Sequence, residues 1–255
     1  MHPSRRKLLV GAAALSAVGR VGAQSRRWAA LSLVGDKIEI IGARPEIGSR
    51  ISQNRRRWAD DAESTMDRYV LQAVDRAVRA QDRGATVAML ALPGSALYDR
   101  PERAFDGRQV ALPGKVVDAL IDGRASHLVL LTKLSDSARV PLYDTTAGVG
   151  SVHGIGFYID PDLRLIMRSA GATAGHSADG LLAPFVYVRV SLVDVQSGEV
   201  VREELVREMR SYATASNPKA SGPWDVLSAE EKVDVLRKMI DQSIGEAIAR
   251  LLRAG

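Results

Sequence analysis

Two histidines and three aspartates gather around the apolar segment GFYID, and their side chains are the best suited to chemistry in this chain. His153 and His176 stand in Gly-rich stretches on either side of that segment, with Asp144, Asp160 and Asp179 close to them in sequence. Imidazole nitrogens and carboxylates are the usual metal ligands and acid–base groups. Their spacing matches neither His-Glu-x-x-His nor an acidic calcium loop. The five residues are therefore a candidate site, with ordinary loop side chains as the simpler alternative.

The two Gly-rich stretches, residues 143–159 and 169–184, are where the sequence would place a site if the protein has one. Long loops on a rigid scaffold commonly carry function. Two histidines and a carboxylate that converge there would favour an enzyme, whereas loops that lie apart would favour a binding module.

No phosphate or nucleotide motif supports a cofactor. Residues 107–115 end in Gly-Lys but have the wrong spacing, an internal proline and no following hydroxyl, so they do not match a phosphate loop. Residues 148–150 begin like a dinucleotide loop, yet His153 stands at the third glycine position and a strand is predicted to follow. Cysteine is absent, which excludes thiol catalysis, disulfides and cysteine metal sites. We therefore expect no cofactor and no metal, and no residue is assigned as catalytic.

Hydrophobic patterning predicts the elements that would hold these residues. In the first half, residues 28–34 and 37–41 read as the two strands of a hairpin that turns at Gly35 and Asp36. Apolar residues at helical spacing predict a helix within residues 60–80. Residues 86–92, TVAMLAL, read as a buried strand.

The same order then repeats. Val116 and Leu120 mark the apolar face of a short predicted helix that ends at Gly123. Residues 127–131, HLVLL, are predicted to form the next strand. His127 opens that strand and is expected to be structural. Helices that alternate with strands predict a sheet with helices packed on it.

The second half is rich in hairpins. GFYID and LRLIM are predicted to meet at Pro161 and Asp162, and FVYVRVSLVDV and EVVREELVREM to meet at residues 196–198. A last helix is predicted at the end of the chain, where Ser228 and Glu231 have the spacing of a capping box.

The long second hairpin has two different strands. In the first, Val188 and Val190 alternate with polar residues and are expected to face the core. In the second, Arg202, Glu204 and Arg207 are expected to face solvent, as on a sheet edge protected by charge.

These elements predict the fold class. No Pro/Ser/Gly-rich linker divides the chain and no segment repeats, so one domain is expected over residues 24–255. It is an α/β domain with α+β character, in which helices pack on a mixed sheet.

Residues 1–23 have the pattern of an export signal. Arg5, Arg6 and Lys7 precede a short apolar run, and small residues lead to a cleavage site after Ala23. The run is too short to span a bilayer, so the mature chain is expected to be periplasmic without a transmembrane segment. The paired arginines resemble a twin-arginine signal, and an ordinary secretory signal stays open as the alternative.

The charge balance argues against nucleic acid as a partner. Residues 1–23 carry four of the 35 basic residues and no acidic one, so 31 basic and 30 acidic residues remain. A nearly neutral chain lacks the positive field that drives binding to phosphate backbones. The clusters at 26–27 and 55–57 could touch anionic lipid or polymer, but such runs are more often solvated loops.

The hairpin FVYVRVSLVDVQSGEVVREELV, with its Leu-Val-Asp-x-x-x-Gly-Glu-Val turn, resembles a family of envelope α/β domains. That family includes the curli secretion-channel subunit, the lipoprotein activator of penicillin-binding proteins and the N-terminal domain of the Tol translocation protein. The likeness extends in element order over residues 66–206. The chain as a whole also looks like uncharacterised exported proteins of proteobacteria. The envelope resemblance implies a non-enzymatic assembly or regulatory module, while the missing lipid-bearing cysteine departs from the lipoproteins of that family.

The sequence therefore predicts an exported, non-catalytic module that binds a protein or another partner of the cell envelope. The alternatives are a hydrolase, or a protein that binds a small ligand, in either case through the loops of residues 143–184. The oligomeric state stays open.

Overall fold

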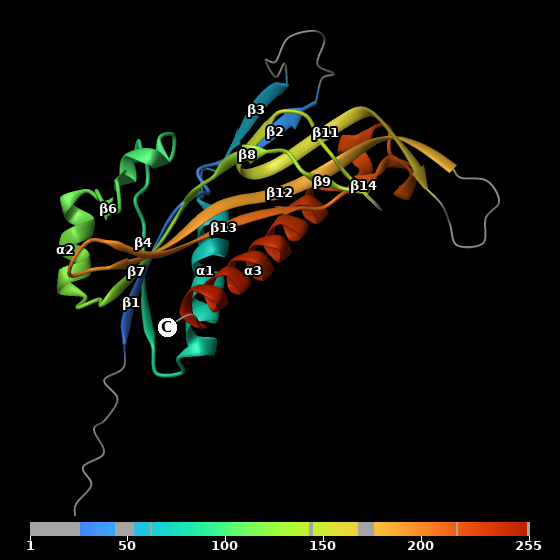
Figure 1. Cartoon of the computed structure of the whole chain (residues 1–255). Coiled ribbons are helices and arrows are strands. Elements are labelled where there is room, and N and C mark those ends of the chain that lie inside the picture. The colour runs from blue at the N-terminus through green and yellow to red at the C-terminus, as the bar shows by residue number, and fades with distance from the viewer. Residues whose placement is uncertain are drawn as a thin grey trace, which may run out of the picture.

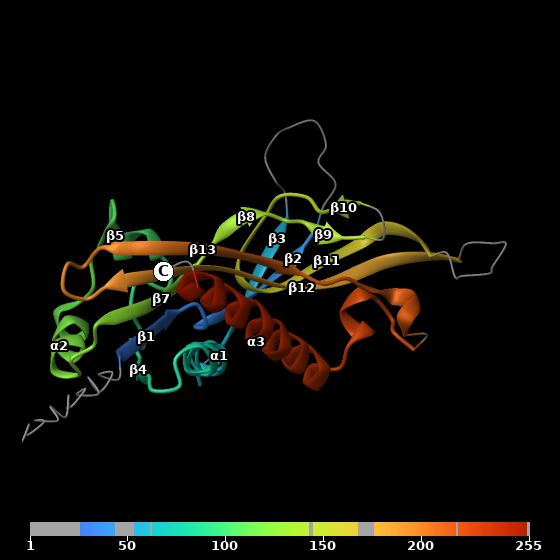
Figure 2. The same ribbon diagram turned by 60° about the horizontal axis from the view of Figure 1, so that its bottom comes forward.

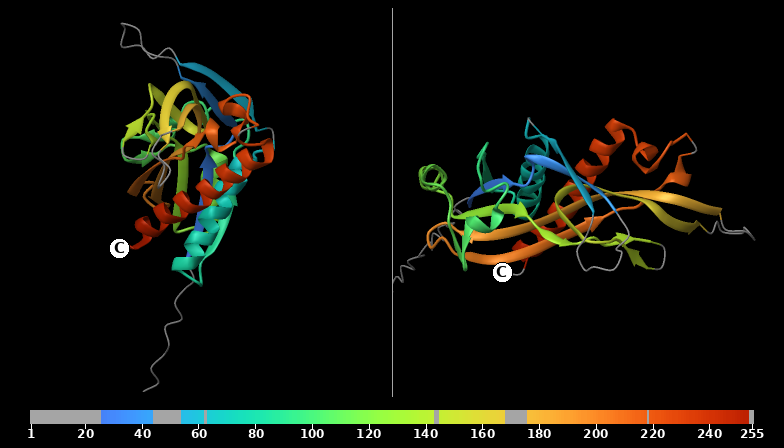
Figure 3. Two further views of the ribbon diagram at one scale, coloured as in Figure 1. Left: turned by 90° about the vertical axis from the view of Figure 1, so that its right-hand side faces the viewer. Right: turned by 90° about the horizontal axis from the view of Figure 1, so that it is seen from above.

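A ten-stranded mixed sheet runs through the protein, and its two long helices lie side by side against one face (Figures 1 and 3). The structure is a computed structural model. It describes residues 26–43, 54–61, 63–142, 145–167, 176–217 and 219–253, with side chains described except at 164–167 and 176–179. The predicted signal with Arg5, Arg6 and Ala23 lies outside the described residues, as does Asp144.

The helices and strands of the described residues follow one another in a mixed order. The α-helices are α1 (Thr65–Gln81), α2 (Gly114–Asp122) and α3 (Ala229–Arg253). The strands of the large sheet are β1 (Arg27–Leu33), β2 (Lys37–Gly42), β3 (Arg55–Asp60), β4 (Thr86–Leu90), β7 (His127–Lys133), β8 (Ser135–Ser137), β11 (Ser151–Met167), β12 (His176–Asp194), β13 (Val200–Met209) and β14 (Tyr212–Ala213). Two small ladders pair β5 (Phe105–Asp106) with β6 (Gln109–Val110) and β9 (Val140–Pro141) with β10 (Thr146–Ala147).

The long strand β12 divides the sheet into two branches (Figure 1). Along one edge it pairs first with β11, as far as Tyr187, and then with β7, from Val188 onward. β2 and β3 continue the β11 branch, whereas β1 and β4 continue the β7 branch. The other edge of β12 carries β13 and β14. The β11 branch and the β7 branch separate between Tyr187 and Val188 of β12, and we call this place the fork.

The predicted hairpin of β1 and β2 is wrong, although both strands exist. β1 pairs in parallel with β4 and β7, whereas β2 pairs with β3 and β11. The chain crosses from one branch to the other at Val34, Gly35 and Asp36. A Cβ atom on Gly35 would lie 2.3 Å from the backbone nitrogen of Asp67. Glycine is therefore required here because the start of α1 packs against the crossing.

The predicted hairpin at Pro161 and Asp162 is also wrong. GFYID and LRLIM belong to one continuous strand, β11, whose pairing with β12 shifts register between Asp160 and Arg164. The irregularity accommodates Pro161, which has no N–H to donate to a ladder. β11 pairs antiparallel with the first half of β12, which begins at His176, earlier than predicted.

Other predicted elements are confirmed. The β12–β13 hairpin turns as expected, since Gly198 donates its N–H to the carbonyl of Asp194 at 2.9 Å. α1, α2, β7 and α3 form where the periodicity predicted them. At the start of α3, Glu231 N–H donates to Ser228 Oγ at 3.2 Å, and Ser228 N–H donates to Glu231 Oε2 at 2.7 Å. β4 forms too, but as a largely exposed strand at the end of the sheet, so its predicted burial is wrong.

The core has three parts. The largest lies between the sheet and the helices α1 and α3 and contains Val188 and Val190. The opposite face of the sheet is covered in two places, by the segment around α2 and by the segment of β8 and β9. The predicted fold class, a single α/β domain with α+β character, is confirmed. No helix among the described residues combines the length and apolar character needed to cross a bilayer.

Candidate functional site

The two candidate histidines do not meet. Both lie in strands rather than in loops, because His153 pairs with Ser135 near the start of β11 and His176 pairs with Met167 at its far end. At about 3.3 Å per residue, the strand between His153 and Met167 spans on the order of 40 Å. The register therefore excludes a site that uses both imidazoles.

Of the three candidate aspartates, Asp160 is the one whose side chain the structure describes. Asp160 Oδ1 accepts the backbone N–H groups of Asp162 at 3.1 Å and Leu163 at 3.0 Å, so this carboxylate shapes the irregular part of β11. The backbone of Asp179 pairs with Arg164 in the β11–β12 ladder. The side chains of His176 and Asp179 lie outside the described residues.

His153 instead belongs to a polar cluster at the fork that no pattern in the sequence indicated. Its members come from β2, β3, β7, β11, the start of α1, the crossing after β1 and the segment after β4. We call it the fork cluster, and it consists of Asp36, Glu39, Arg56, Asp67, Tyr98, Lys133 and His153. The parallel strands β1 and β7 end here, and the carboxyl ends of parallel strands are a common place for sites.

Asp67 is the most heavily bonded carboxylate of the fork cluster. It is 5% exposed, and its Oδ1 atom accepts hydrogen bonds from Ser32 Oγ at 2.5 Å, Gly35 N at 2.9 Å and Val34 N at 3.2 Å. Its Oδ2 atom accepts the phenol of Tyr98 at 2.6 Å. Burial raises the pKa of Asp67, and these hydrogen bonds oppose the rise. Burial, and then the bond to Asp67, raise the pKa of Tyr98.

Glu39 is the second buried carboxylate, at 3% exposure. It forms an ion pair with Arg56 and accepts the backbone N–H of His153 at 2.8 Å. Arg56 also donates to the carbonyl of Ser151 at 2.7 Å and to its hydroxyl at 2.9 Å. Burial raises the pKa of Glu39, and the positive charge of Arg56 opposes the rise. Arg56 thus lies in an edge strand, β3, and not in the solvated loop predicted for residues 55–57.

Lys133 and His153 complete the fork cluster. Lys133, whose side chain is 7% exposed, forms an ion pair with Asp36 and lies 5.9 Å from the ring centre of Tyr98. The pKa of the His153 imidazole is lowered by burial and then by the nearby charges of Lys133 and Arg56. This ring is therefore held neutral near pH 7.

The hydrogen bonds of the fork cluster hold separate segments of the fold together. Its two buried carboxylates accept hydrogen bonds from donors of the protein itself. Asp67 connects β1 and the segment after β4 to α1, and Glu39 connects β2 to β3 and β11. Among the described residues, no three side chains of His, Cys, Asp and Glu gather to hold a metal ion. His127 is structural as expected, since it stacks on Trp28 with ring centres 5.0 Å apart.

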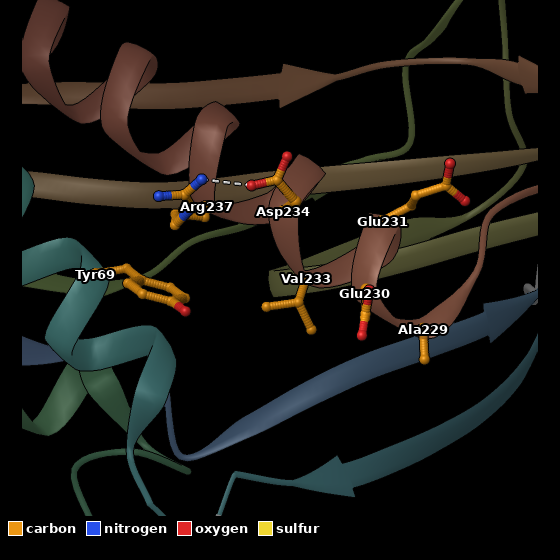
Figure 4. A pocket seen from close by; sticks show the side chains of 7 residues that line it. All are labelled: Tyr69, Ala229, Glu230, Glu231, Val233, Asp234 and Arg237. Carbon is orange, nitrogen blue, oxygen red and sulfur yellow. Dashed lines mark hydrogen bonds and ion pairs between the residues drawn. The ribbon is translucent and has the colours of Figure 1, made fainter.

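Two surface hollows lie away from the fork cluster. The larger, about 700 Å³, is a shallow depression between Tyr69 of α1 and the start of α3 (Figure 4). Two of its three acidic groups already have partners, since Asp234 pairs with Arg237 at 2.5 Å and Glu231 caps the helix. The smaller, about 230 Å³, lies where residues 205–208 of β13 run beside α3.

The smaller hollow adjoins an open sheet edge. β13 pairs with β12 on one side, and its first residue, Val200, donates its N–H to Arg108 O on the other. Beyond Val200, no strand of the described residues pairs with the outer edge of β13. We call residues 201–209 of this edge the open edge.

The hydrogen-bond phase of β13 identifies the groups that point outward. Arg210 N–H donates to Pro184 O at 3.1 Å, so residue 210 faces β12. Residues of a strand alternate between its two edges. The even-numbered residues from 202 to 210 therefore bond to β12, and the N–H and C=O groups of residues 203, 205, 207 and 209 point outward. Val201 is the extra residue where the β12–β13 register shifts, so the alternation holds from residue 202 onward.

Charged side chains of β13 that were predicted to face solvent form hydrogen bonds and ion pairs with other parts of the protein. Arg202 donates to the carbonyl of Leu251 at 2.7 Å, and Glu204 pairs with Arg250 of α3 at 3.0 Å. Both side chains are half-buried on the helix face, so the prediction that they face solvent is wrong. Arg207 lies on the other face and pairs with Asp136 at 2.5 Å.

Comparison with known proteins leaves the family open. No family model matches the chain, and no curated protein matches it. Three solved structures that resemble it come from different bacteria. A protein described as a neuraminyllactose-binding hemagglutinin homologue of Helicobacter pylori has 9% identity and a TM-score of 0.39 over 90% of this chain and 82% of that one.

The other two likenesses are equally distant. The PelC dodecamer of Paraburkholderia phytofirmans has 10% identity and a TM-score of 0.34, with 88% of this chain and 86% of that one covered. Protein XCC0632 of Xanthomonas campestris, of family DUF330, has 10% identity and a TM-score of 0.34, with 89% and 80% covered. No functional conclusion follows from similarities at this level.

Proposed function

We propose that this protein is an exported, non-catalytic module that binds a protein partner of the cell envelope through the open edge of β13. The observation that carries the proposal is the row of outward N–H and C=O groups at residues 203, 205, 207 and 209. An extended segment that adds to such an edge gains main-chain hydrogen bonds, and its side chains provide specificity.

The surroundings of the open edge support this use. The hollow beside residues 205–208 leaves room on the helix face, where Ser243, Glu246 and Arg250 of α3 line it. Exposed charges along the strand, such as Glu203 and Arg207, would admit a segment of matching charge and repel others.

The envelope location rests on the sequence. Residues 1–23 have the pattern of an export signal, and the β12–β13 hairpin carries the resemblance to envelope domains. N-terminal sequencing of the exported protein should begin at Gln24. Replacement of Arg5 and Arg6 by Lys should block export by the twin-arginine route and leave the general secretory route working. Full-length protein retained in the cytoplasm would contradict the proposed location.

A proline at Leu205 tests the binding edge. Leu205→Pro removes one outward N–H and leaves the ladder to β12 intact, since proline is tolerated on the outer side of an edge strand. We expect crosslinked capture of envelope partners to be lost while the melting temperature stays close to that of the wild type. The matched control Leu205→Ala shortens the same side chain but keeps the N–H, and should capture normally. Unchanged capture by Leu205→Pro would refute the proposal.

The phase of β13 also shows why Val206 is the wrong position for this test. Val206 is 4% exposed and lies opposite Val188, and its N–H faces β12. A proline there would remove an inner ladder bond and unfold the hairpin, so loss of binding would say nothing about the open edge.

A further inference from the structure

The open edge of β13 is complementary to itself. Residues 202–208 read REELVRE, so the pair Arg-Glu stands at 202–203 and again at 207–208. When two copies run antiparallel with Leu205 opposite Leu205, Arg202 of each copy faces Glu208 of the other. Glu203 of each copy then faces Arg207 of the other. Four opposite-charge pairs form and no like-charge pair arises.

The backbone phase permits this register. Strands that join edge to edge must place outward-pointing residues opposite one another. With Leu205 at the centre, residue 203 of each copy lies opposite residue 207 of the other. All of these residues point outward in the open edge, so the charge pattern and the hydrogen-bond pattern agree.

Neighbouring registers lack this agreement. Centred on residue 203, 204 or 207, the pairing places identical charges directly opposite each other: Glu203, Glu204 or Arg207. Centred on Val206, it places Glu204 opposite Glu208. Like charges directly opposite each other destabilise a strand pair.

We propose that the segment bound at the open edge is β13 of a second copy of this chain, related by a two-fold axis at Leu205. This inference rests on the proposed function and names the partner of the same edge. The same patch serves both copies, which is the symmetry expected of a closed dimer. Figure 2 shows the β12–β13 hairpin with α3 running alongside it. The hollow beside residues 205–208 lies between the open edge and that helix.

The charges that usually protect a sheet edge do not oppose this pairing. An edge carrying one sign of charge repels its own copy in every register. Here the signs are mixed, and the present partners of the exposed pair are on the same chain: Arg189 lies 3.5 Å from Glu203, and Asp136 lies 2.5 Å from Arg207. These exposed carboxylates and guanidinium groups retain capacity for a second partner across the axis.

Two single charge reversals test the register. In Glu203→Lys, the new lysine of each copy faces Arg207 of the other, and in Arg207→Glu, the new glutamate faces Glu203. Each variant alone should dimerise at least about tenfold more weakly than the wild type, because two cross-strand pairs turn repulsive. An equal mixture of the two variants should recover dimerisation, because every pair between the two different chains is then of opposite charge. Sedimentation equilibrium measures all of these states.

Matched controls separate this effect from a change in net charge. Glu230→Lys and Arg83→Glu make the same charge changes at exposed positions outside β13, and they should dimerise like the wild type. The melting temperature of each variant checks that it folds. Leu205→Pro should be monomeric and folded.

The outcomes also distinguish this inference from the proposed function. Wild-type protein that stays monomeric up to about 0.5 mM, or a mixture that does not recover dimerisation, would overturn the self-pairing. If Leu205→Pro then still loses a captured envelope partner, the proposed function stands with a different partner. If Leu205→Pro changes neither dimerisation nor capture, both are wrong.

Discussion

The phenol of Tyr98 donates a hydrogen bond of 2.6 Å to the carboxylate of Asp67, 31 residues earlier in the chain. Tyr98 belongs to the segment after β4, whereas Asp67 lies in the first turn of α1 and also accepts the hydroxyl of Ser32 from β1. One buried carboxylate thus holds three separate segments at the fork.

Removal of that carboxylate should destabilise the fold strongly. Asp67→Ala leaves the Ser32 and Tyr98 hydroxyls and the Gly35 N–H buried without their acceptor, which should cost about 3 kcal/mol or more. Asp67→Asn keeps an acceptor for Ser32 and Gly35 and should cost about 1 kcal/mol. Urea unfolding of both variants measures the difference. An alanine variant as stable as the wild type would show that the carboxylate does not hold these segments together.

The raised pKa of Asp67 predicts a direction for the pH dependence. Burial raises this pKa above its ordinary value of 3.8, so the folded protein binds the proton more tightly than the unfolded chain. The wild type should therefore lose stability from this group as the pH rises from 3.8 through the raised pKa. Asp67→Asn lacks that loss, so its stability relative to the wild type should improve over the same range. Urea unfolding at several pH values measures this difference in unfolding free energy between the two proteins. A difference that stays constant with pH would contradict the prediction.

The lowered pKa of His153 predicts a pH dependence of stability with the opposite direction. Burial, followed by the charges of Lys133 and Arg56, lowers its pKa below 6.5, so the fold favours the neutral ring. The stability that this provides is lost as the pH falls below 6.5 toward the lowered pKa. NMR titration should give a pKa below 6.5 for His153, and His153→Gln should reduce the loss of stability in acid. A normal or raised pKa would show that the ring is not buried beside those cations.

Gly156 should not tolerate a side chain. A Cβ atom there would lie 1.9 Å from the carbonyl oxygen of Glu39, where β11 and β2 pair in parallel. Gly156→Ala should therefore force the two strands apart and cost about 2 kcal/mol or more. Gly114→Ala at the start of α2 is the control, because nothing lies within 4 Å of its Cβ position. Equal melting temperatures for the two variants would contradict the parallel pairing.

The β12–β13 hairpin offers a test of core against surface. Val190 is fully buried opposite Glu204, so Val190→Asp places a carboxylate in the apolar core and should cost about 3 kcal/mol or more. Glu204→Ala removes a partly exposed ion pair with Arg250 and should change the free energy of unfolding by less than about 1 kcal/mol. Thermal unfolding compares the two. A stable Val190→Asp variant would mean that this side of β12 does not face the core.

Features that depend on residues close in sequence were predictable. Ser228 and Glu231 are three residues apart, so the capping box formed as expected, and the turn of the β12–β13 hairpin is closed within five residues by Asp194 and Gly198. Helical and alternating periodicity likewise reports which side of a single element is apolar. The open edge of β13 was also visible as a charged strand, although its outward groups were not.

Tertiary structure decided which strands pair and which polar groups meet. β1 and β2 have the pattern of a hairpin, but any strand offers the same backbone donors and acceptors, and each found a partner in a different branch. The fork cluster could not be predicted because Asp67 lies 35 residues from Ser32, and only the crossing at Gly35 brings them together. The sequence by itself determined the elements and their apolar faces, because those depend on neighbours along the chain. The fold decided the sheet order, the fork and the separation of His153 from His176, because those depend on long-range competition among strands for the same edges.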